Sequence, residues 1–479
     1  MTDVKAVSRE GSDVAIEGSA IEALSEGLRG DVLTPQSRDY ESSRLVWNGM
    51  IDRRPALIAR CSGTADVVDA VDFAREHDLL VAVRGGGHNV AGFGTCDGGI
   101  VIDLSGMHHV AVDPEARTAW VEPGARLIDL DRETQLFGLA TPAGVISDTG
   151  MAGLTLGGGQ GHLARKYGLS CDSLRSAQVV TAGGEVVRAA EDENADLFWG
   201  LRGGGGNFGI VTEFEFDAYK VGPEVAACLV FYPIEAAEQV FAFFRDWFGD
   251  GPDEVSAIAV TMAIPEEEPF PRDLQGAPTV AILAANCGPA DAGERTLMPL
   301  RQITEPLLDM STPMPFVMLQ TLLDQLYPSH DVRYYWKSTY VDGLSDDVIG
   351  TIIERYRSTP SPLTSIDAWA GGGAIAQVGE DETAFSGRQK PFLVNIEASW
   401  LLPEEDQANV NWARGTWSAL REFSSDGAMY FNFPGALEEG QELMRSTFGQ
   451  KYERLARLKA KYDPSNMFRL NQNIEPLVG

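Results

Sequence analysis

The sequence predicts an α+β protein with a glycine-rich binding domain, a middle domain and a C-terminal segment that packs back on the first domain. Three glycine-rich segments occur before residue 210, among short strand and helix patterns. Beyond about residue 222 the glycine runs become rarer, helical stretches alternate with longer strand patterns, and the last 45 residues return to helix. We therefore divide the 479-residue chain into residues 1–220, 221–425 and 426–479.

Short elements in alternation are predicted for the first domain. Residues 64–79 carry Val and Ala at helical spacing, and an apolar strand follows and ends in the glycine run RGGGHN. Further strands are expected at residues 100–105, 108–113 and 118–124, and Gly183–Gly184 turns a hairpin within residues 177–190.

Long strands dominate the prediction for the middle domain. The patterns VRYYWKSTYV (332–341), SIDAWAGGGAIAQV (365–378) and PFLVNIEASWL (391–401) are typical of strands. Near the end of the chain, a helix that includes ERLARLKAKY is stopped by Asp463–Pro464.

The composition excludes several classes of partner. Acidic residues number 70 and basic residues 38, for a net charge of −32, which argues against nucleic acid or an anionic membrane as partner. We expect adaptation to a high-salt cytoplasm in preference to an ordinary acidic cytosolic protein, because concentrated salt screens surface repulsion. No long apolar run or leader pattern occurs, so we expect a cytoplasmic protein without a membrane span. The five cysteines are scattered without a CxxC pair, so neither disulfides nor a zinc site are expected.

The glycine segments RGGGHN, LTLGGGQG and LRGGGGNFG predict a bound cofactor diphosphate. Glycine lets backbone N–H groups approach an anion closely, and three such segments in one domain exceed what tight turns require. GGGNFG at residues 204–209 matches G-x-G-x-x-G, but a helix precedes it and a strand follows, so a Rossmann site is rejected. No Walker lysine follows any glycine run. His88, directly behind the first run, is a candidate hydrogen-bonding group, metal ligand, general base or covalent attachment point.

Four motifs occur in order along the chain: RGGGHNVAGFGTCDGGIVIDLS, TPAGVISDTGMAGLTLGGGQGHLARKYGL, ADLFWGLRGGGGNFGIVTEFEF and YDPSNMFRLNQNI. Together they resemble the berberine-bridge-enzyme-like branch of the vanillyl-alcohol-oxidase flavoproteins over nearly the whole chain. The resemblance implies a PCMH-type FAD-binding domain completed by the C-terminal segment, with a substrate domain between. It also implies that FAD contacts Arg84, Gly85, Gly86, Gly87, His88, Asn89, Pro142, Gly144, Val145, Thr149, Gly150, Gly153, Leu154, Gly157, Gly158, Gly209, Ile210, Val211, Asn432, Asn471 and Asn473.

The same resemblance implies how FAD is attached. The residue matching His88 commonly bonds to the flavin 8α-methyl carbon. Many relatives carry a second, cysteinyl bond, but Ile146 stands at that position here, so we expect one bond only. Thr149 stands where residue size often controls oxygen access, which leaves oxygen or another acceptor open.

The catalytic base is not given by the resemblance. Many relatives use the last tyrosine of Y-x-N-Y, whereas this chain reads YFNF and ends in Phe433. Glu397 is our first candidate, on the polar face of residues 391–401, with a carboxylate on a solvated face as the alternative. Tyr335 and Lys337 share one face of their strand and are second candidates, and Tyr430 is a further one unless it is a packed core tyrosine.

The sequence leads to two hypotheses of function. The first is an FAD-dependent oxidoreductase that oxidises a C–OH or C–N bond of a small organic molecule, with a sugar or secondary alcohol fitting slightly better. The second is a flavin-binding protein with little catalysis, because Phe433 replaces a common base. A nicotinamide-dependent UDP-sugar reductase of related fold would not explain His88. The sequence leaves the oligomeric state open.

Overall fold

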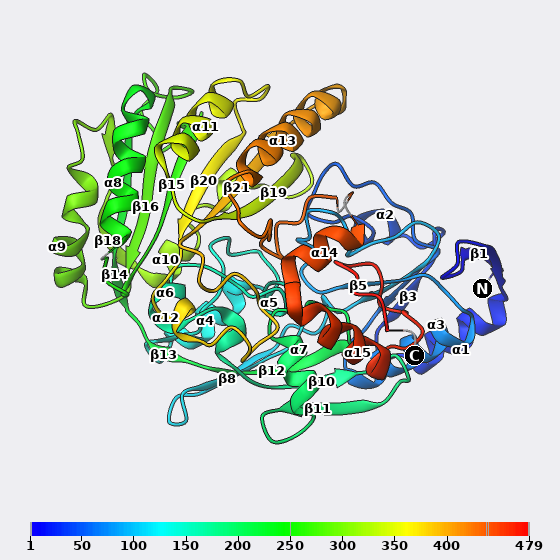
Figure 1. The fold of residues 1–479 in the computed structure, drawn as a ribbon. Coiled ribbons are helices and arrows are strands. Elements are labelled where there is room, and N and C mark those ends of the chain that lie inside the picture. Colours follow the sequence, from blue (N-terminus) through cyan, green and yellow to red (C-terminus); the bar gives the residue numbers. More distant parts are fainter. Residues whose placement is uncertain (1, 250, 437, 439, 478–479) are drawn as a thin grey trace.

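The computed structural model describes residues 2–249, 251–436, 438 and 440–477. Its elements form two halves, one at the lower right of Figure 1 and one at the upper left. The first and last parts of the chain build the lower half, and the middle part builds the upper half.

A small mixed sheet begins the lower half. Strands β4 (Leu57–Arg60) and β5 (Val81–Arg84) both pair in parallel with β6 (Ile100–Asp103), and β3 (Asp31–Leu33) pairs antiparallel with β4. Helix α3 (Thr64–Glu76) connects β4 to β5 and buries Val67 and Val71 with the apolar residues of this sheet. Strand β5 ends at the first residue of RGGGHN, so the sheet fixes where the glycine segment begins.

The lower half also contains an antiparallel sheet, which lies on the other side of α3. Its strand order is β11 (Val186–Ala190), β10 (Leu174–Val180), β12 (Ile210–Asp217), β8 (Thr118–Val121) and β7 (Val110–Asp113). The predicted hairpin is confirmed as β10 and β11. The third glycine segment leads directly from α7 (Ala195–Leu201) into β12, which is the helix-to-strand order that argues against a Rossmann site.

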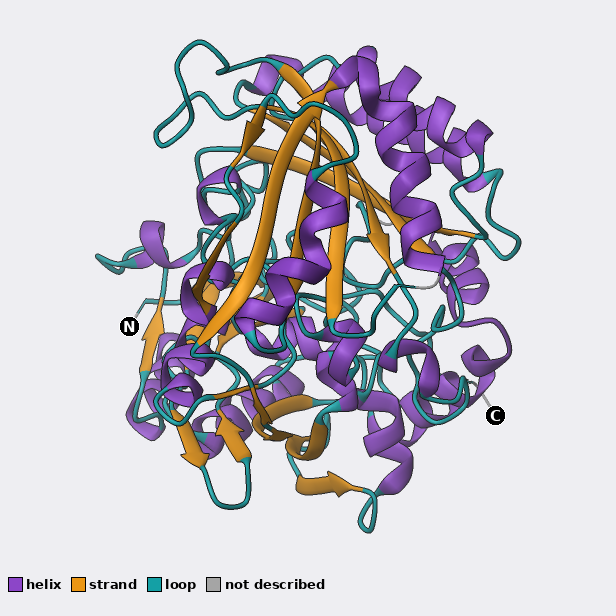
Figure 2. Ribbon diagram, turned by 90° about the vertical axis from the view of Figure 1, so that its left-hand side faces the viewer, coloured by secondary structure: helices purple, strands orange, loops and turns teal. Residues whose placement is uncertain are grey.

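The upper half is a large antiparallel sheet, whose long strands are seen in Figure 2. Helices α8 (Ala237–Gly249), α9 (Ala290–Arg301), α11 (Asp346–Arg357) and α13 (Asp406–Arg421) lie on its outer face (Figure 1). The strands run in the order β17 (Leu308–Asp309), β14 (Glu224–Pro233), β16 (Pro278–Asn286), β15 (Val255–Ala263), β20 (Ser365–Ala370), β21 (Phe392–Trp400) and β19 (Arg333–Val341), and β18 (Thr312–Pro315) pairs with β14.

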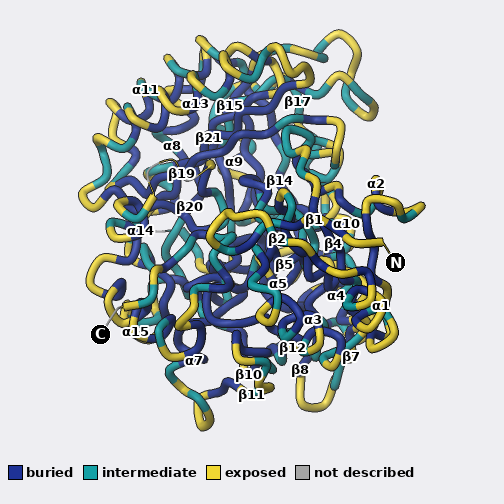
Figure 3. The backbone as a smooth tube through the Cα atoms, turned by 90° about the vertical axis from the view of Figure 1, so that its right-hand side faces the viewer, coloured by how far each residue is buried: buried dark blue, intermediate teal, exposed yellow. Residues whose placement is uncertain are grey.

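Every residue of β20 and β21 is buried (Figure 3). A strand that is buried along its whole length must be covered on both faces. On one face of β21, Val394, Ile396 and Trp400 pack in the core that includes α13. The other face lies against the lower half, and this is where the cavity described below is found.

The chain returns to the lower half at its C-terminal end. Helix α14 (Gly440–Phe448) is followed by α15 (Tyr452–Tyr462), which packs on α7. The Lys459 ammonium and the Asp463 carboxylate are both fully buried, 2.7 Å apart, and the ammonium also donates to the carbonyl oxygens of Asn207 and Phe468. This pair fixes the C-terminal segment to the third glycine segment.

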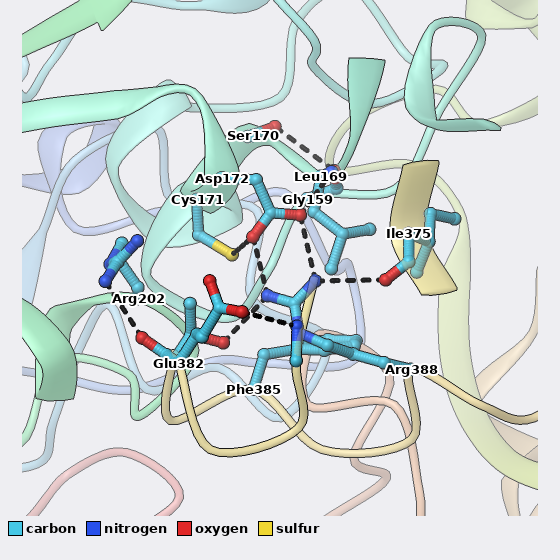
Figure 4. A network of polar contacts seen from close by, with 12 residues as sticks. Gly159, Leu169, Ser170, Cys171, Asp172, Arg202, Ile375, Glu382, Phe385 and Arg388 are labelled. Carbon is cyan, nitrogen blue, oxygen red and sulfur yellow. Dashed lines mark hydrogen bonds and ion pairs between the residues drawn. The ribbon is translucent and has the colours of Figure 1, made fainter. Parts of the chain in front are cut away.

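A second buried ion pair joins the halves (Figure 4). The Arg388 guanidinium, in the segment before β21, donates to both oxygens of Asp172 at 2.9 and 2.5 Å. Asp172 follows the second glycine segment and also accepts from the backbone N–H of Leu169. The nearby Phe385 backbone N–H donates to the backbone carbonyl oxygen of Arg202, so the segment from the upper half is held at two points.

One predicted strand is only half correct. The pattern at residues 365–378 continues as a strand only to Ala370. Gly372 and Gly373 then take φ values of +80° and +55°, which break the extended chain, and the short helix α12 (Ala374–Gln377) follows.

Candidate active site

A large cavity lies between the two halves, with about 1750 Å³ of open space including its mouth. Its lower wall is built from the three glycine segments, strand β12 and the C-terminal segment, and its upper wall from β19, β20 and β21. Of the predicted FAD contacts, Pro142, Gly158 and Asn473 do not line it. All the others do: Arg84, Gly85, Gly86, Gly87, His88, Asn89, Gly144, Val145, Thr149, Gly150, Gly153, Leu154, Gly157, Gly209, Ile210, Val211, Asn432 and Asn471.

The three exceptions have other environments. A Cβ on Gly158 would lie 2.6 Å from the Phe385 ring, so this glycine makes room for a protein side chain. The Asn473 backbone carbonyl oxygen accepts a hydrogen bond from the Gln441 side chain, which ties the residues after α15 to α14. Pro142 precedes the lining residue Gly144 by two positions and lies outside the lining.

Glycines of the lower wall serve two different purposes. A Cβ on Gly86 would lie 2.5 Å from the Cα of Gly150, so the first glycine segment touches, backbone to backbone, the residue that precedes helix α5 (Met151–Leu156). A Cβ on Gly153 or Gly206 would meet no protein atom within 4 Å, although both residues line the cavity. Space that these missing side chains would occupy therefore remains open to a ligand, which is how a cofactor cradle should look.

His88 is oriented by two contacts. Its Nε2 lies 2.9 Å from Oδ1 of Asp148, and its ring stacks on Trp47 with 4.3 Å between centroids. The other Asp148 oxygen accepts a bond from Ser329 at 3.2 Å. Burial opposes ionisation of Asp148, but the bond from His88 lowers the pKa of this carboxyl, so the carboxylate accepts and Nε2 carries the hydrogen. Nδ1 is then the ring nitrogen with a free lone pair.

Arg84 has a structural partner. Its guanidinium donates to both oxygens of Asp103 at 3.2 and 2.6 Å, and both side chains are buried. The pair joins the ends of β5 and β6, next to the first glycine segment. Arg84 thus lines the cavity with its charge already compensated.

Glu397 lies on the upper wall and is only 4% exposed, so the solvated-face alternative is wrong. Its Oε2 accepts from the Tyr327 hydroxyl at 2.5 Å and from the Ser365 hydroxyl at 3.3 Å. Burial raises the pKa of Glu397 to about 7, although the bond from Tyr327 lowers it. A carboxyl group with this pKa can exchange a proton near neutral pH.

Asp367, on β20, lies close to Glu397, which is on the neighbouring strand β21. The sequence analysis did not identify Asp367. It is 5% exposed, and its Oδ2 accepts from the indole N–H of Trp369 at 3.0 Å. Burial and the nearby Glu397 both raise the pKa of Asp367 well above its usual range. The alternation in SIDAWA could have identified it, because Ser365, Asp367 and Trp369 share the face opposite Ile366.

Tyr335 and Lys337 were wrong as cavity residues. In the register of β19 and β21, Trp336 is opposite Glu397, so Trp336 faces the cavity and its two neighbours face α13. The Lys337 ammonium lies 4.3 Å from the Trp417 ring centroid and 3.5 Å from Glu438. The Tyr335 hydroxyl donates to Glu438 at 2.5 Å.

Tyr430 lines the cavity but its hydroxyl is already engaged. It accepts from the backbone N–H groups of Gly159 and Gln160 at 3.2 and 3.0 Å, and from the Asn432 amide at 3.0 Å. These contacts hold the second glycine segment against the C-terminal segment. Tyr430 thus has a positioning role, and Phe433 beside it packs edge-on against Trp336.

Tyr327 and Asp148 were also missed. Tyr327 comes from an irregular segment before β19, and Asp148 from the loop after Ile146, and neither shows a periodic pattern in the sequence. Within the described residues, no group of three or more His, Cys, Asp or Glu side chains could hold a metal ion. In the same part of the chain, no helix is both long and apolar enough to cross a membrane.

Two family descriptions match the chain. The FAD binding domain matches residues 55–190, and the description "Berberine and berberine like" matches residues 429–475. These segments carry most of the lower wall of the cavity, and the third glycine segment and β12 lie between them in the sequence.

Whole-length relatives agree with both matches. An uncharacterised FAD-linked oxidoreductase of Bacillus subtilis (strain 168) is 31% identical over 94% of this chain and 98% of its own length. The (R)-6-hydroxynicotine oxidase of Paenarthrobacter nicotinovorans is 29% identical over 94% of this chain and 97% of its own. The glucooligosaccharide oxidase of Acremonium strictum, described with a 6-S-cysteinyl, 8α-N1-histidyl FAD, superposes with a TM-score of 0.84 at 25% identity, covering 96% of this chain and all of that one.

Proposed function

This chain belongs to the berberine-bridge-enzyme-like family of FAD-linked oxidoreductases, and we propose that it oxidises a C–OH or C–N bond with Glu397 as base and FAD bound covalently through His88 alone. The FAD-dependent oxidation of a small organic substrate is the common activity of its characterised relatives. The observation that carries the finer proposal is the cavity itself, in which glycine backbone faces a buried carboxyl group.

FAD fits the lower wall. Gly153 and Gly206 leave space there, and the backbone contact of Gly86 with Gly150 shapes the wall. Asn471 presents a buried Oδ1 without a hydrogen-bond partner among the described residues, as an acceptor for the ligand. Bound FAD supplies the acceptor for a hydride that leaves the substrate carbon.

Attachment through His88 is supported by its bonding. Because Asp148 engages Nε2, Nδ1 has the lone pair that a bond to the flavin 8α carbon requires. The position of the second tether is Ile146, which lines the cavity with an unreactive side chain. All five cysteines are buried, and none lines the cavity, so a cysteinyl bond has no candidate there.

Glu397 supports proton removal from the substrate O–H or N–H. It lines the cavity, and its pKa of about 7 lets it ionise at neutral pH and still accept a proton. Tyr327 holds the carboxylate in place through a 2.5 Å hydrogen bond. Phe433 cannot take this part because a phenyl ring accepts no proton.

Two relatives are named for different kinds of substrate: (R)-6-hydroxynicotine oxidase for a hydroxynicotine, and glucooligosaccharide oxidase for an oligosaccharide. For this chain we propose a small-molecule substrate, with molecular oxygen or another acceptor oxidising the reduced flavin again. Thr149, whose size the resemblance ties to oxygen access, lines the cavity.

The experiment is a cycle of reduction and reoxidation on the purified flavoprotein. Sugars, secondary alcohols and heterocyclic amines are mixed anaerobically with it, and bleaching of the flavin is followed. Air and then an artificial acceptor are admitted to separate samples, which identifies the class of acceptor. We expect at least one substrate class to bleach the wild type, and Glu397→Gln to slow that bleaching strongly while the exposed Glu404→Gln does not.

A second candidate function, a flavin-binding protein with little catalysis, is favoured by Phe433. It predicts flavin that dithionite reduces but no substrate bleaches. Bleaching that is equally fast in Glu397→Gln would instead keep the oxidoreductase and reject Glu397 as base.

A further inference from the structure

The upper wall of the cavity holds two carboxyl groups without a compensating cation. Asp367 and Glu397 are both at least nine-tenths buried and both line the cavity. Among the described lining residues, the only arginine is Arg84, which is paired with Asp103 on the lower wall, and there is no lysine. Lys337, on β19, lies on the face of the sheet opposite the cavity, next to Glu438 and Trp417.

Asp367 is only half satisfied. Its Oδ2 accepts from Trp369, whereas its Oδ1 is buried and accepts no hydrogen bond of ordinary geometry from the described residues. Burial raises the pKa of Asp367, and Asn395, opposite it on β21, lies near enough to oppose that effect only in part. Glu397, by contrast, already accepts from Tyr327 and Ser365. An unpaired buried carboxylate oxygen is strongly unfavourable unless a proton or a ligand satisfies it, so this atom marks where a donor is expected.

Aromatic rings surround the two carboxyl groups. Trp369 is two residues from Asp367 on the same face of β20, and Trp336 is opposite Glu397 on β19. Tyr327 and Phe433 each pack edge-on against Trp336, with centroids 5.4 and 5.3 Å away. Aromatic faces with an adjacent carboxylate bind ammonium groups, because both attract positive charge.

We propose that this upper wall binds the substrate as a protonated amine, with the ammonium N–H groups directed at Asp367 and Glu397 between Trp336 and Trp369. The inference rests on the proposed oxidoreductase function and narrows its substrate class. It departs from the hydroxylated substrate favoured by the sequence.

The oxidation of a protonated amine conserves atoms, charge and electrons with a carboxylate as base and FAD as hydride acceptor. One carboxylate takes the N–H proton from the ammonium and leaves a neutral amine with a lone pair. The adjacent C–H would then break and release its hydrogen with both electrons as a hydride, which FAD would accept when bound, while the nitrogen lone pair forms a C=N bond. The product is an iminium ion, and the enzyme has gained one proton and one hydride.

The test compares two probes of the same shape, N-methylbenzylamine and benzyl methyl ether, by anaerobic titration calorimetry on the oxidised holoprotein. We expect the amine to bind about tenfold more tightly than the ether or better. Asp367→Asn should bring the two affinities within about threefold by weakening only the amine. The matched control is Asp347→Asn, which changes an exposed carboxylate on α11 and should preserve the preference.

Equal binding of amine and ether by the wild type would overturn the inference, whether or not the variant folds. Preference for the amine that survives in both Asp367→Asn and Glu397→Gln would overturn it as well. Because the readout is binding, either result leaves the oxidoreductase proposal standing. That proposal fails separately, if no substrate class bleaches the flavin.

Discussion

The lower and upper walls of the cavity differ in which part of the chain they present to a ligand. On the lower wall, glycines expose backbone, and the charges near them, such as Arg84 with Asp103, are already paired. On the upper wall, strands present side chains, among them two buried carboxyl groups and large aromatic rings. A constant cofactor can be held by backbone shape, whereas a particular substrate must be recognised and deprotonated by particular side chains.

The largest effect is expected on the lower wall, from Gly86→Ala. The new Cβ would lie 2.5 Å from the Gly150 Cα and 2.6 Å from its nitrogen, and backbone atoms cannot move aside cheaply. We expect a loss of stability of about 1–3 kcal/mol and nearly complete loss of bound flavin. Flavin absorbance per protein and the thermal midpoint are the measurements.

Gly153→Ala is the matched control for that variant. Its Cβ would meet no protein atom, and Ala favours helix α5 (Met151–Leu156) by about 1 kcal/mol over Gly. The protein should therefore fold at least as stably as the wild type and yet hold less flavin. Full flavin content in Gly153→Ala would show that this glycine does not face the cofactor.

Next in size is Glu397→Gln on the upper wall. Loss of the base should slow anaerobic flavin reduction by about 10²- to 10⁴-fold, measured with the substrate that bleaches the wild type fastest. In the wild type, the ionised form is active and its pKa is about 7, so the rate should rise with pH through about 7 and then level off. The variant should lack this inflection, and an unchanged pH profile would reject Glu397 as the group that titrates.

A smaller effect is expected from Tyr327→Phe. The hydroxyl stabilises the Glu397 carboxylate, so its removal should raise the pKa of Glu397 and move the inflection to higher pH. A hydrogen bond to a charged group predicts a displacement of about one to two pH units. The same pH series on Tyr327→Phe measures it, and a displacement to lower pH would contradict the assigned direction of the bond.

The smallest effect on rate is expected from Tyr335→Phe, which lies on the outer face of the same sheet. It removes the hydroxyl bonded to Glu438 and should cost about 1 kcal/mol in denaturant unfolding. The rate of anaerobic flavin reduction in Tyr335→Phe should stay within about twofold of the wild-type rate at every pH, since no atom of the cavity is changed. A large rate loss would mean that the two faces of β19 have been exchanged.

The two walls also differed in how well the sequence predicted them. The glycine segments revealed the lower wall, because a backbone that must approach a ligand leaves a local mark in the sequence. Pro142, Gly158 and Asn473 do not line the cavity, since neighbours in a motif need not face the same space, and their contact with FAD stays a prediction. The FAD cofactor and the α+β fold with a PCMH-type domain are confirmed by the relatives. The domain boundaries, the cytoplasmic location and the salt adaptation stay predictions.

The upper wall was predicted in part. Alternation placed Glu397 on the correct face of β21, but it could not show which face of β19 meets the cavity, and Tyr335 and Lys337 were chosen in place of Trp336. That choice depends on the register between strands that are about 60 residues apart in sequence. Tyr327 and Asp148 enter from irregular segments, and only long-range packing decides where such residues point.

The most direct test of the account is the attachment of FAD to the lower wall. Wild type and His88→Ala are denatured in acid and run on a gel, the protein bands are examined for flavin fluorescence, and the tryptic peptide with residue 88 is weighed. The account predicts a fluorescent wild-type band, a peptide carrying the mass of the flavin, and no fluorescence in the variant. Flavin released completely from the wild type, or a band of His88→Ala that still fluoresces, would contradict attachment through His88 alone.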